Sequence, residues 1–363
     1  MSPIAIAEDD IVRTHEEAEA NEREPLVVTG PLERFLDEHG IGSGDVEFDP
    51  IGEGHSNVTF AVRRGDTEFV LRRPPRGPLP PSAHDVLREA RVLAAVEQGA
   101  RVPKVLAVCA DEAVIGAPFY LMEKMTGHVI TTDIPAEIDG VEERRRLADE
   151  LIDALVEIHA VDWQACGLEG FGKPSGYLER QLRRFNGLWE HNKTRDIPQV
   201  ETVGKWLADN LPNPSPPTPA TVVHGDFRLG NVMYELELPP RLNAIFDWEM
   251  ATIGDPLADL GYLCMTWSEA SDPQGGLSRL SAVTRQEGFP TRAEMVERYS
   301  ERSGRSVGDL RWYLTLATWK SVVFMEGNYK RAVAGSTDDP FLKTFGDGVI
   351  EIAERAEEFA LAG

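Results

Sequence analysis

The sequence predicts an α+β fold of two lobes, a small β-rich N-lobe and a mainly α-helical C-lobe. At 363 residues the chain exceeds the roughly 100–200 residues of an ordinary domain, so two packed units are expected. Segments rich in β-branched residues and glycine dominate up to about residue 125, and apolar residues at helical spacing dominate after Gly127. We therefore divide the chain into an acidic flexible tail (1–24), an N-lobe (25–125) and a C-lobe (126–363).

Composition limits the classes of partner and the compartment. Asp and Glu number 61 against 37 Lys and Arg, and the net charge of −24 disfavours binding to nucleic acid or to an anionic membrane. No apolar run approaches the roughly 20 residues that span a bilayer, and residues 1–10 lack the features of a secretory signal. The three cysteines stand far apart without a CxxC pair, which argues against a zinc site or a disulfide framework. We expect a cytoplasmic protein, whose oligomeric state the sequence does not indicate.

The elements of the N-lobe follow from local patterns. Residues 8–24 are acidic and poor in large apolar side chains, which is typical of a mobile tail or a frayed helix, and we exclude them from the fold. A short helix, a strand pair, a third strand, a proline-rich breaker, a helix and two further strands should follow. They are expected at residues 32–39, 45–66, 68–72, 74–81, 82–96, 104–109 and 118–124. Ser82 followed by Asp85 resembles a capping box and should start the second helix.

The C-lobe should be mainly helical, with one β-like island. Leu147, Leu151, Leu155 and Ile158 recur at helical spacing, which predicts a helix through this segment. Further helical patterns cover residues 177–193, 307–333 and 341–361. A proline-rich stretch at 212–219 precedes the island, which covers residues 221–247.

The island carries the strongest functional signal in the chain. It reads HGDFRLGN from His224 to Asn231, then a short strand and a turn, then IFDWE around Asp247. Phosphoryl transfer needs one carboxylate at the acceptor hydroxyl, and an amide oxygen and a second carboxylate that hold Mg²⁺ against the phosphates of ATP. The pattern therefore predicts Asp226 as catalytic base and Asn231 and Asp247 as Mg²⁺ ligands, with ATP and Mg²⁺ as cofactors.

Each of these residues also has a structural interpretation. Asp226 and Asn231 are common turn residues, and Asp247 would suit a helix N-cap. Their occurrence together, in this order and between apolar strands, favours the catalytic interpretation. For His224 we expect a hydrogen bond that holds the loop rather than proton transfer, because Asp226 already supplies a base.

The segments HGDFRLGN and DWEMATIGDPLADLGYL resemble the aminoglycoside phosphotransferase and choline kinase superfamily, whose members share the protein-kinase fold and phosphorylate small hydroxylated molecules with ATP. More narrowly, VLRRPP with DWEMATIGDPLADL is similar to the phosphotransferase branch found as free bacterial proteins and fused to acyl-CoA dehydrogenases. The resemblance begins near residue 30 and is most specific over residues 224–260. It implies a bilobal protein-kinase-like fold, the same base and metal ligands, and support of the site by Asp255 and Asp259. For this pair we expect structural support rather than direct ligation.

A glycine-containing turn in the N-lobe is the candidate phosphate-covering loop. Gly52 and Gly54 would let the backbone approach a phosphate closely, and the amides of His55, Ser56 and Asn57 would face it. A hairpin turn uses the same residue types, so the prediction depends on the position of the turn in the first strand pair.

Arg72 stands where a protein kinase has the strand lysine that pairs with a helix glutamate and contacts the phosphates. This departs from the broad superfamily but matches the narrower branch. Glu89 interrupts an apolar helix stripe that includes Val86 and Leu93, and a buried carboxylate there needs a cation. We predict that Arg72 pairs with Glu89 and that both contribute to nucleotide binding.

Four further residues have assigned places. Arg73 should point to the opposite face of its strand, toward solvent or the acceptor. Glu123 and Met125, at the end of the last N-lobe strand, would form the hinge where adenine bonds to the backbone. For His159 we expect a packed or capping histidine.

The identity of the phosphate acceptor stays open. An acidic cleft would suit an aminoglycoside or a choline-like cation, whereas the narrower resemblance favours a hydroxyacyl or other metabolic hydroxyl compound. Glu326, Asp338 and Asp339 are candidate carboxylates for a cationic acceptor. Two alternative functions remain: a nucleotide-binding regulator of the pseudokinase type without turnover, and an aminoglycoside or macrolide kinase. The sequence also does not indicate whether ATP or GTP is the phosphate donor.

Overall fold

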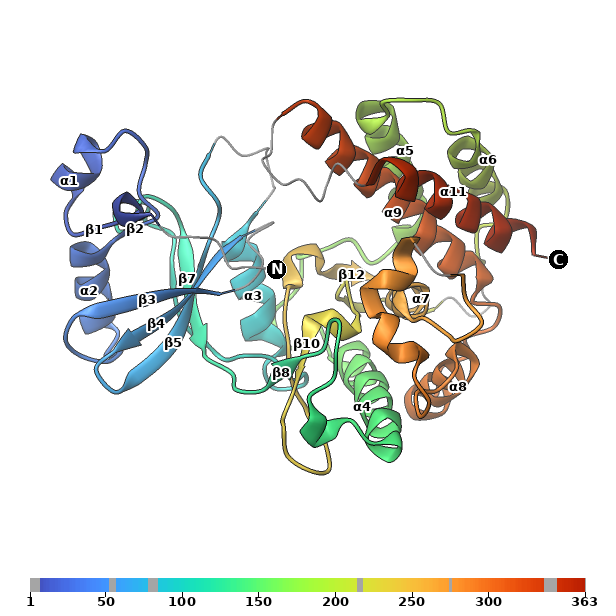
Figure 1. The fold of residues 1–363 in the computed structure, drawn as a ribbon, viewed down its shortest axis with the longest axis horizontal. Helices are drawn as coiled ribbons and strands as arrows, with labels where there is room; N and C mark the ends of the chain where they lie inside the picture. The colour runs from blue at the N-terminus through green and yellow to red at the C-terminus, as the bar shows by residue number, and fades with distance from the viewer. Residues whose placement is uncertain are drawn as a thin grey trace. The chain divides into compact units, whose positions relative to one another are not determined.

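The computed structural model describes residues 7–51, 57–77, 84–213, 218–273, 276–335 and 345–362. The chain divides into two compact units: unit 1 comprises residues 1–98 and 102–126, and unit 2 comprises residues 99–101 and 127–363. Figure 1 shows that unit 1 is organised around a sheet and that helices dominate unit 2. Within the described residues, no helix is long and apolar enough to cross a membrane.

Unit 1 contains a five-stranded antiparallel sheet with the strand order β3-β4-β5-β7-β6. The strands are β3 (Val46–Ile51), β4 (Val58–Arg64), β5 (Thr67–Arg73), β6 (Val105–Cys109) and β7 (Phe119–Glu123). Side chains alternate between the faces of a strand, so Phe69 and Leu71 of β5 lie on one face and Val70 and Arg72 on the other. The strands expected in the N-lobe are confirmed.

Each face of this sheet has a helix associated with it. Leu32 and Leu36 of α2 (Thr29–Glu38) share a hydrophobic core with Phe69 and Leu71. On the other face lies α3 (Val86–Val96), whose Glu89 side chain meets Arg72 of β5. Both faces of β5 are therefore covered, which fixes the surroundings of its two terminal arginines.

The start of α3 differs from the expected capping box. Asp85 is the N-cap, and its side chain accepts a hydrogen bond from the backbone N–H of Arg88 at 3.0 Å. Ser82 lies outside the described residues. The carboxylate satisfies one of the free amides of the first turn, so α3 begins four residues later than predicted.

The acidic segment 8–24 was expected to lie outside the fold, and the structure corrects this expectation. It forms η1 (Glu8–Asp10), β1 (Ile11–Val12) and α1 (His15–Ala20), and β1 pairs in parallel with β2 (Val27–Val28). Asp10 is 2% exposed and forms ion pairs with Arg23, at 2.7 Å, and with Arg76. These distant arginines compensate the buried acid, and composition alone does not reveal such a pairing.

Four helices of unit 2 pack against α9, and α4 packs against α8. The bounds are α4 (Val141–Ala160), α5 (Tyr177–Asn192), α6 (Pro198–Asp209), α7 (Leu257–Thr266), α8 (Arg292–Ser303), α9 (Arg311–Val333) and α11 (Phe345–Leu361). Helix α9 contacts α5, α6, α7 and α11, and Trp319 and Val322 on α9 are fully buried. The predicted helices correspond to α4, α5, α9 and α11. The predicted helical patterns did not include α6, α7 or α8; in α8 only Met295 and Tyr299 are buried, so its apolar periodicity is weak.

Two small sheets in unit 2 position the predicted catalytic segment. One has the order β11-β10-β8 and the other pairs β12 with β9. The strands are β8 (His128–Val129), β9 (Thr221–Val223), β10 (Val232–Tyr234), β11 (Leu242–Ile245) and β12 (Thr252–Gly254). The β-like island predicted at residues 221–247 is therefore confirmed.

Candidate active site

The loop between β9 and β10 presents Asp226. Gly225 has φ of +89°, and a Cβ atom there would lie 2.8 Å from the carbonyl oxygen of Met250, so the turn requires glycine. Asn231, 7% exposed, ends the short helix η3 (Leu229–Asn231). The tight turn and the short helix return the chain at once to β10, which keeps Asp226 and Asn231 close together.

The two oxygens of the Asp226 carboxylate have different surroundings. Asn231 Nδ2 donates to Asp226 Oδ2 at 2.9 Å and to the Asp226 carbonyl oxygen at 2.8 Å. Asp226 Oδ1 is buried without a hydrogen-bond partner among the described residues, while the hydroxyl of Tyr262 interacts with the same carboxylate. Arg228 Nε lies 3.7 Å from Oδ1, close enough for attraction but too far for a hydrogen bond. One acceptor atom of Asp226 is thus fixed and the other is left for a ligand.

Asn231 and Asp247 lie at the adjacent ends of two paired strands. Val232 of β10 is opposite Ile245 of β11, and Phe246 N donates to the carbonyl oxygen of Asn231 at 2.9 Å. Because the amide nitrogen of Asn231 is bonded to Asp226, its side-chain oxygen is the atom that remains for a ligand. Asp247 has φ of +64°, a left-handed conformation that costs a non-glycine residue on the order of 1–3 kcal/mol and that clusters at functional sites.

This pair of side chains suits Mg²⁺. Mg²⁺ prefers hard oxygen ligands, keeps several waters, and takes one or two protein ligands together with substrate phosphates. Among the described residues, no group of three or more His, Cys, Asp or Glu side chains is placed to hold a metal ion. A metal at this position would therefore depend on one amide oxygen, one carboxylate and the phosphates of a nucleotide.

His224 holds the loop, as predicted. Its Nδ1 accepts from the Asp226 N–H at 3.2 Å, and its Nε2 lies 2.9 Å from the Phe246 carbonyl oxygen. Both contacts are satisfied by the neutral tautomer with the proton on Nε2. The ring also packs 4.7 Å, centroid to centroid, from Trp248. His224 thus links the backbone on which Asp226 stands to the strand end that precedes Asp247.

Asp259 fixes the same loop from α7. Its carboxylate is fully buried and accepts from His224 N at 2.7 Å, from Gly225 N at 2.8 Å and from His159 Nε2 at 3.3 Å. Burial alone would raise the pKa of Asp259, but the His159 hydrogen bond and charge, the His224 charge and the Gly225 amide together hold the pKa below its usual value. His159 bonds through Nδ1 to Tyr299 at 2.7 Å and is 2% exposed, so the expected packed histidine is confirmed.

Asp255 supports the start of α7 rather than the loop. Its carboxylate accepts from Leu257 N at 2.9 Å and from the Tyr313 hydroxyl at 2.8 Å. Burial raises the pKa of Asp255, although these two hydrogen bonds oppose the shift. These contacts give both Asp255 and Asp259 a structural function.

In unit 1, the expected contact between Arg72 and Glu89 is present. Arg72 Nε donates to Glu89 Oε2 at 2.9 Å, and the two side chains are 15% and 2% exposed. Asn57, 5% exposed, places Nδ2 at 3.4 Å from the same carboxylate oxygen, while its own Oδ1 has no hydrogen-bond partner among the described residues. The contribution of these three residues to nucleotide binding remains a prediction.

The other nucleotide-side predictions have different outcomes. Gly52, Gly54, His55 and Ser56 lie outside the described residues. Glu123 ends β7 and donates its backbone N–H to the Lys104 carbonyl oxygen at 2.9 Å, and Met125 lies two residues further along, near the end of unit 1.

The prediction for Arg73 is wrong. Arg73 is 1% exposed, donates from Nε to the Pro74 carbonyl oxygen at 3.0 Å and also bonds to the Leu26 carbonyl oxygen. Burial lowers its pKa to about 10. Arg73 does lie on the face of β5 opposite Arg72, but the segment around Leu26 covers that face.

Glu326 is not available to a cationic acceptor. It is fully buried and accepts from Thr194 N at 3.0 Å, from the Thr194 hydroxyl at 2.6 Å and from Arg195 at 3.0 Å. The structure therefore assigns Glu326 a structural function, and Asp338 and Asp339 lie outside the described residues.

Two residues near the loop escaped the sequence analysis. Tyr262 of α7 and Lys320 of α9 both line a pocket with Gly225. Burial, together with the nearby Asp226 carboxylate, raises the pKa of Tyr262 well above its usual value. A signal for Lys320 was available, because it is a lone cation in the apolar run Ala-Thr-Trp-Lys-Ser-Val-Val.

A family profile described as the phosphotransferase enzyme family (APH) matches residues 47–295. The chain belongs to this phosphotransferase family. It is 31% identical to a putative aminoglycoside phosphotransferase from Ralstonia eutropha of known structure, with a TM-score of 0.77 and coverage of 91% of this chain and 97% of the other. Aminoglycoside phosphotransferase APH(4)-Ia, solved with AMP-PNP and hygromycin B, is 17% identical at a TM-score of 0.58, covering 92% of this chain and 99% of the other, and shows the fold alone. The predicted protein-kinase-like α+β fold is confirmed.

Curated relatives are longer proteins with dehydrogenase names. Acyl-CoA dehydrogenase family member 10 from Mus musculus is 35% identical over 335 residues, which cover 91% of this chain and 30% of the relative. Acyl-CoA dehydrogenase family member 11 from Gallus gallus is 33% identical over 343 residues, which cover 91% of this chain and 43% of the relative. The chain thus spans less than half of the length of these relatives.

Proposed function

We propose that this chain is an ATP-dependent small-molecule kinase with an alcohol as acceptor, in which unit 1 binds the nucleotide and unit 2 carries the catalytic loop and the acceptor site. The carboxylate of Asp226 is the observation that supports this function most directly. Asn231 fixes its Oδ2, while its Oδ1 is buried without a donor among the described residues. Such an atom costs on the order of 1–3 kcal/mol, and a substrate hydroxyl would supply the missing donor.

In the proposed reaction Asp226 orients the acceptor and takes its proton. The hydroxyl proton passes to Asp226 Oδ1 as the acceptor oxygen bonds to the γ-phosphorus and ADP leaves. Asn231 and Asp247 would hold Mg²⁺, which supplies positive charge to offset that of the transferring phosphoryl group. His224 and Asp259 act on the geometry only, by holding the backbone on either side of Gly225.

The nucleotide side of the proposal depends on unit 1. Arg72, positioned by Glu89, would contact the phosphates with its guanidinium fork. The other proposed nucleotide-binding residues are Gly52, Gly54, His55, Ser56, Asn57, Glu123 and Met125. We place the reaction in the cytoplasm, without a nucleic acid or membrane partner.

For the acceptor, we propose a hydroxylated metabolite rather than an aminoglycoside or a macrolide. The acyl-CoA dehydrogenase names of the relatives favour a hydroxyacyl or related compound. The Glu326 carboxylate already accepts hydrogen bonds from Thr194 and Arg195, so it is not available to bind a polycationic acceptor. Hygromycin B and kanamycin are bound by structural neighbours at 17% identity, a likeness that concerns the fold alone.

A panel of hydroxyl compounds with ATP, read by mass spectrometry of phosphorylated products, tests the proposal. It should include aminoglycosides, macrolides, hydroxyacyl thioesters and simple hydroxy compounds. We expect turnover of a metabolic alcohol. A kcat/KM for an antibiotic of about 10⁴ M⁻¹s⁻¹ or above would instead favour the function of an antibiotic kinase. Nucleotide binding without consumption of ATP across the panel would favour the regulator.

Two matched amide variants separate the proposed functions of the carboxylates. Asp226→Asn should keep Mg²⁺-dependent ATP binding close to that of the wild type but lose roughly 10²–10⁴ in single-turnover rate, the usual contribution of a positioned base. Asp247→Asn tolerates the left-handed backbone, so its effect should come from the lost metal ligand and should weaken both Mg²⁺ dependence and rate. Asp209→Asn, on the exposed end of α6, is the control. If Asp226→Asn abolishes nucleotide binding while Asp247→Asn keeps affinity and rate, the assignment is wrong.

A further inference from the structure

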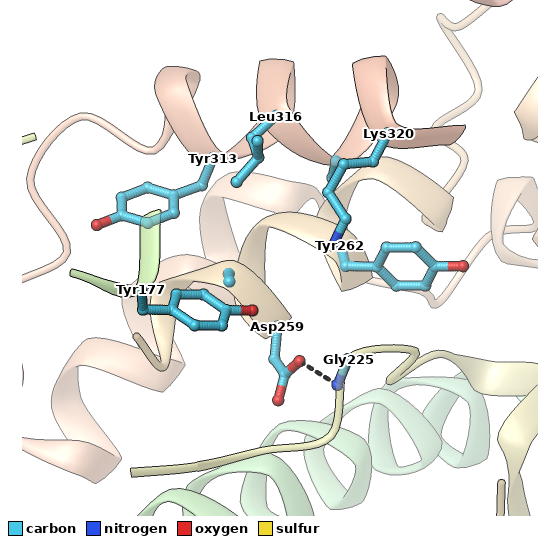
Figure 2. Close-up of a pocket in the computed structure, with 9 residues that line it drawn as sticks. Tyr177, Gly225, Asp259, Tyr262, Tyr313, Leu316 and Lys320 are labelled. Carbon is cyan, nitrogen blue, oxygen red and sulfur yellow. Dashed lines mark hydrogen bonds between the residues drawn. The ribbon is translucent and has the colours of Figure 1, made fainter. Parts of the chain in front are cut away.

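A pocket in unit 2 lies directly beside the catalytic loop. Its lining includes Tyr177, Gly225, Asp259, Tyr262 and Lys320, and it has about 10 Å³ of water-accessible volume, roughly the space of one water molecule. Gly225 precedes Asp226, so the Cα atoms of these two residues are about 3.8 Å apart. Figure 2 shows Lys320 extending from α9 toward Tyr262 on α7, above Gly225 and Asp259. An atom in this pocket, such as one oxygen of a larger molecule, would therefore lie beside the proposed base.

Lys320 is the cation that lines this pocket. Among the described residues it forms no ion pair and no hydrogen bond; its Nζ lies 4.8 Å from the centroid of the Phe185 ring. Burial, followed by the charge of Arg184, lowers the pKa of Lys320 to about 8, although Asp259 and Asp226 oppose the shift. The Phe185 ring and the charges of Asp259 and Asp226 offset only part of the cost of burying this ammonium, because no anion among the described residues contacts it.

Other half-buried cations of unit 2 are treated differently. Several have a carboxylate within ion-pair distance, as in the pairs Arg101–Glu150, Arg195–Glu326 and Arg292–Asp272, and others, such as Arg285 and Arg305, bond to backbone carbonyl oxygens. A side chain that serves only the fold is paired in this way, whereas a titratable group left unpaired in a pocket beside a catalytic loop is typical of a functional site.

The carboxylates nearest to Lys320 already have other partners. Asp259 accepts from two backbone amides of the loop and from His159, and Asp226 accepts from Asn231. Two further cations add to the positive charge: Arg184, whose guanidinium lies 6.0 Å from the Phe185 ring, and Arg228 beside Asp226. Both carboxylates are thus engaged elsewhere, and among the described residues neither contacts the Lys320 ammonium.

We propose that Lys320 binds an anionic oxygen group of the phosphate acceptor, so that the substrate is an alcohol that carries a carboxylate or a comparable anion. This inference rests on the kinase function proposed above. The ammonium offers three donors, and the hydroxyl of Tyr177, which lines the same pocket, would add a fourth. Binding the anion at Lys320 would hold the other end of the substrate, with its hydroxyl, at Asp226.

The test compares compounds that differ only in the charged end. Hydroxycarboxylates, diols and amino alcohols of matched chain length are assayed for ATP-dependent phosphorylation with wild type, Lys320→Met and Lys320→Arg. Lys205→Met, on the exposed face of α6, is the matched control. We expect the wild type to prefer the hydroxycarboxylates in kcat/KM by about 10–100-fold, the usual effect of a hydrogen bond to a charged group. That preference should disappear in Lys320→Met, persist in part in Lys320→Arg and be unchanged in Lys205→Met.

A second measurement does not depend on turnover. Acetylation of Lys320 by acetic anhydride, followed by peptide mass spectrometry, should slow when the hydroxycarboxylates are added and should not respond to the diols, while acetylation of Lys205 responds to neither. If hydroxycarboxylates protect Lys320 from acetylation but no compound is phosphorylated, the proposed kinase function is wrong and the anion site at Lys320 is supported. Phosphorylation with equal preference in wild type and Lys320→Met, absence of protection, or a preference for amino alcohols would each overturn the inference.

Discussion

Removing either partner of the Arg72–Glu89 ion pair should destabilise unit 1. Removing both should lower the free energy of unfolding by less than the sum of the two single losses. The pair is joined at 2.9 Å, and the side chains are 15% and 2% exposed. Arg72→Met leaves the buried carboxylate of Glu89 without its cation, so the free energy of unfolding should fall by about 3–5 kcal/mol. Glu89→Gln keeps the shape of the side chain and removes its charge, so about 1.5–3 kcal/mol should be lost.

The double variant measures the coupling between the two residues. With neither charge present, its loss should fall short of the sum of the single losses by about 1.5–3 kcal/mol. The exposed pair Arg63–Glu47, on β4 and β3 of the same sheet, is the matched control. Its side chains are 59% and 67% exposed, so its coupling should stay below about 1 kcal/mol.

The assay must report on unit 1. The seven tryptophans of the chain lie between residues 163 and 319, so their fluorescence reports on unit 2. Hydrogen exchange of peptides that cover β5 and α3 gives the opening free energy of unit 1 for each variant, and calorimetry gives the affinity for Mg-ATP. Single losses that add within about 0.5 kcal/mol would show that the residues are not coupled. Unchanged ATP affinity in every variant would refute their proposed contribution to nucleotide binding.

Two further predictions concern the pH dependence of unit 2, both measured by tryptophan fluorescence during thermal or urea unfolding. Burial raises the pKa of Asp259, but the His159 hydrogen bond and charge, the His224 charge and the Gly225 amide together hold it below its unfolded value of about 3.9. The carboxylate therefore stabilises the fold above about pH 4 and loses this effect as the pH falls. In Asp259→Asn the stability should depend less on pH below about pH 4 than in the wild type. The same dependence in both proteins would contradict this prediction. Burial lowers the pKa of Lys320 to about 8, against about 10.4 in the unfolded chain. Between about pH 8 and about pH 10.4 the unfolded chain therefore binds more protons than the folded protein, so the stability of the wild type should rise with pH in this range. Lys320→Met should show no such rise and should melt at a higher temperature than the wild type at pH 7. Equal pH dependence of the two proteins would count against a buried ammonium at Lys320.

The sequence by itself located the centre of the candidate site because the relevant residues are close along the chain. Asp226 and Asn231 belong to one loop, and Asp247 follows one strand later. Turn chemistry and strand alternation act over a few residues, so a single local pattern brings these groups together. The contact between Arg72 and Glu89 was also readable, since an acid on an apolar helix stripe requires a cation and the alternation along β5 indicates which arginine faces the helix.

Tertiary structure decided what lies on the other side of each element. Arg73 is buried because the segment around Leu26 covers its face of the sheet, and no local pattern along β5 indicates that cover. Lys320 lies almost a hundred residues from Gly225 in the chain, and the packing of α9 against α7 places both in one pocket. Periodicity shows that a residue is on the inner face of its helix, but not which distant element that face will meet. The physical reason is that local preferences depend on near neighbours in the chain, whereas burial and charge pairing depend on contacts that exist only after the chain has folded.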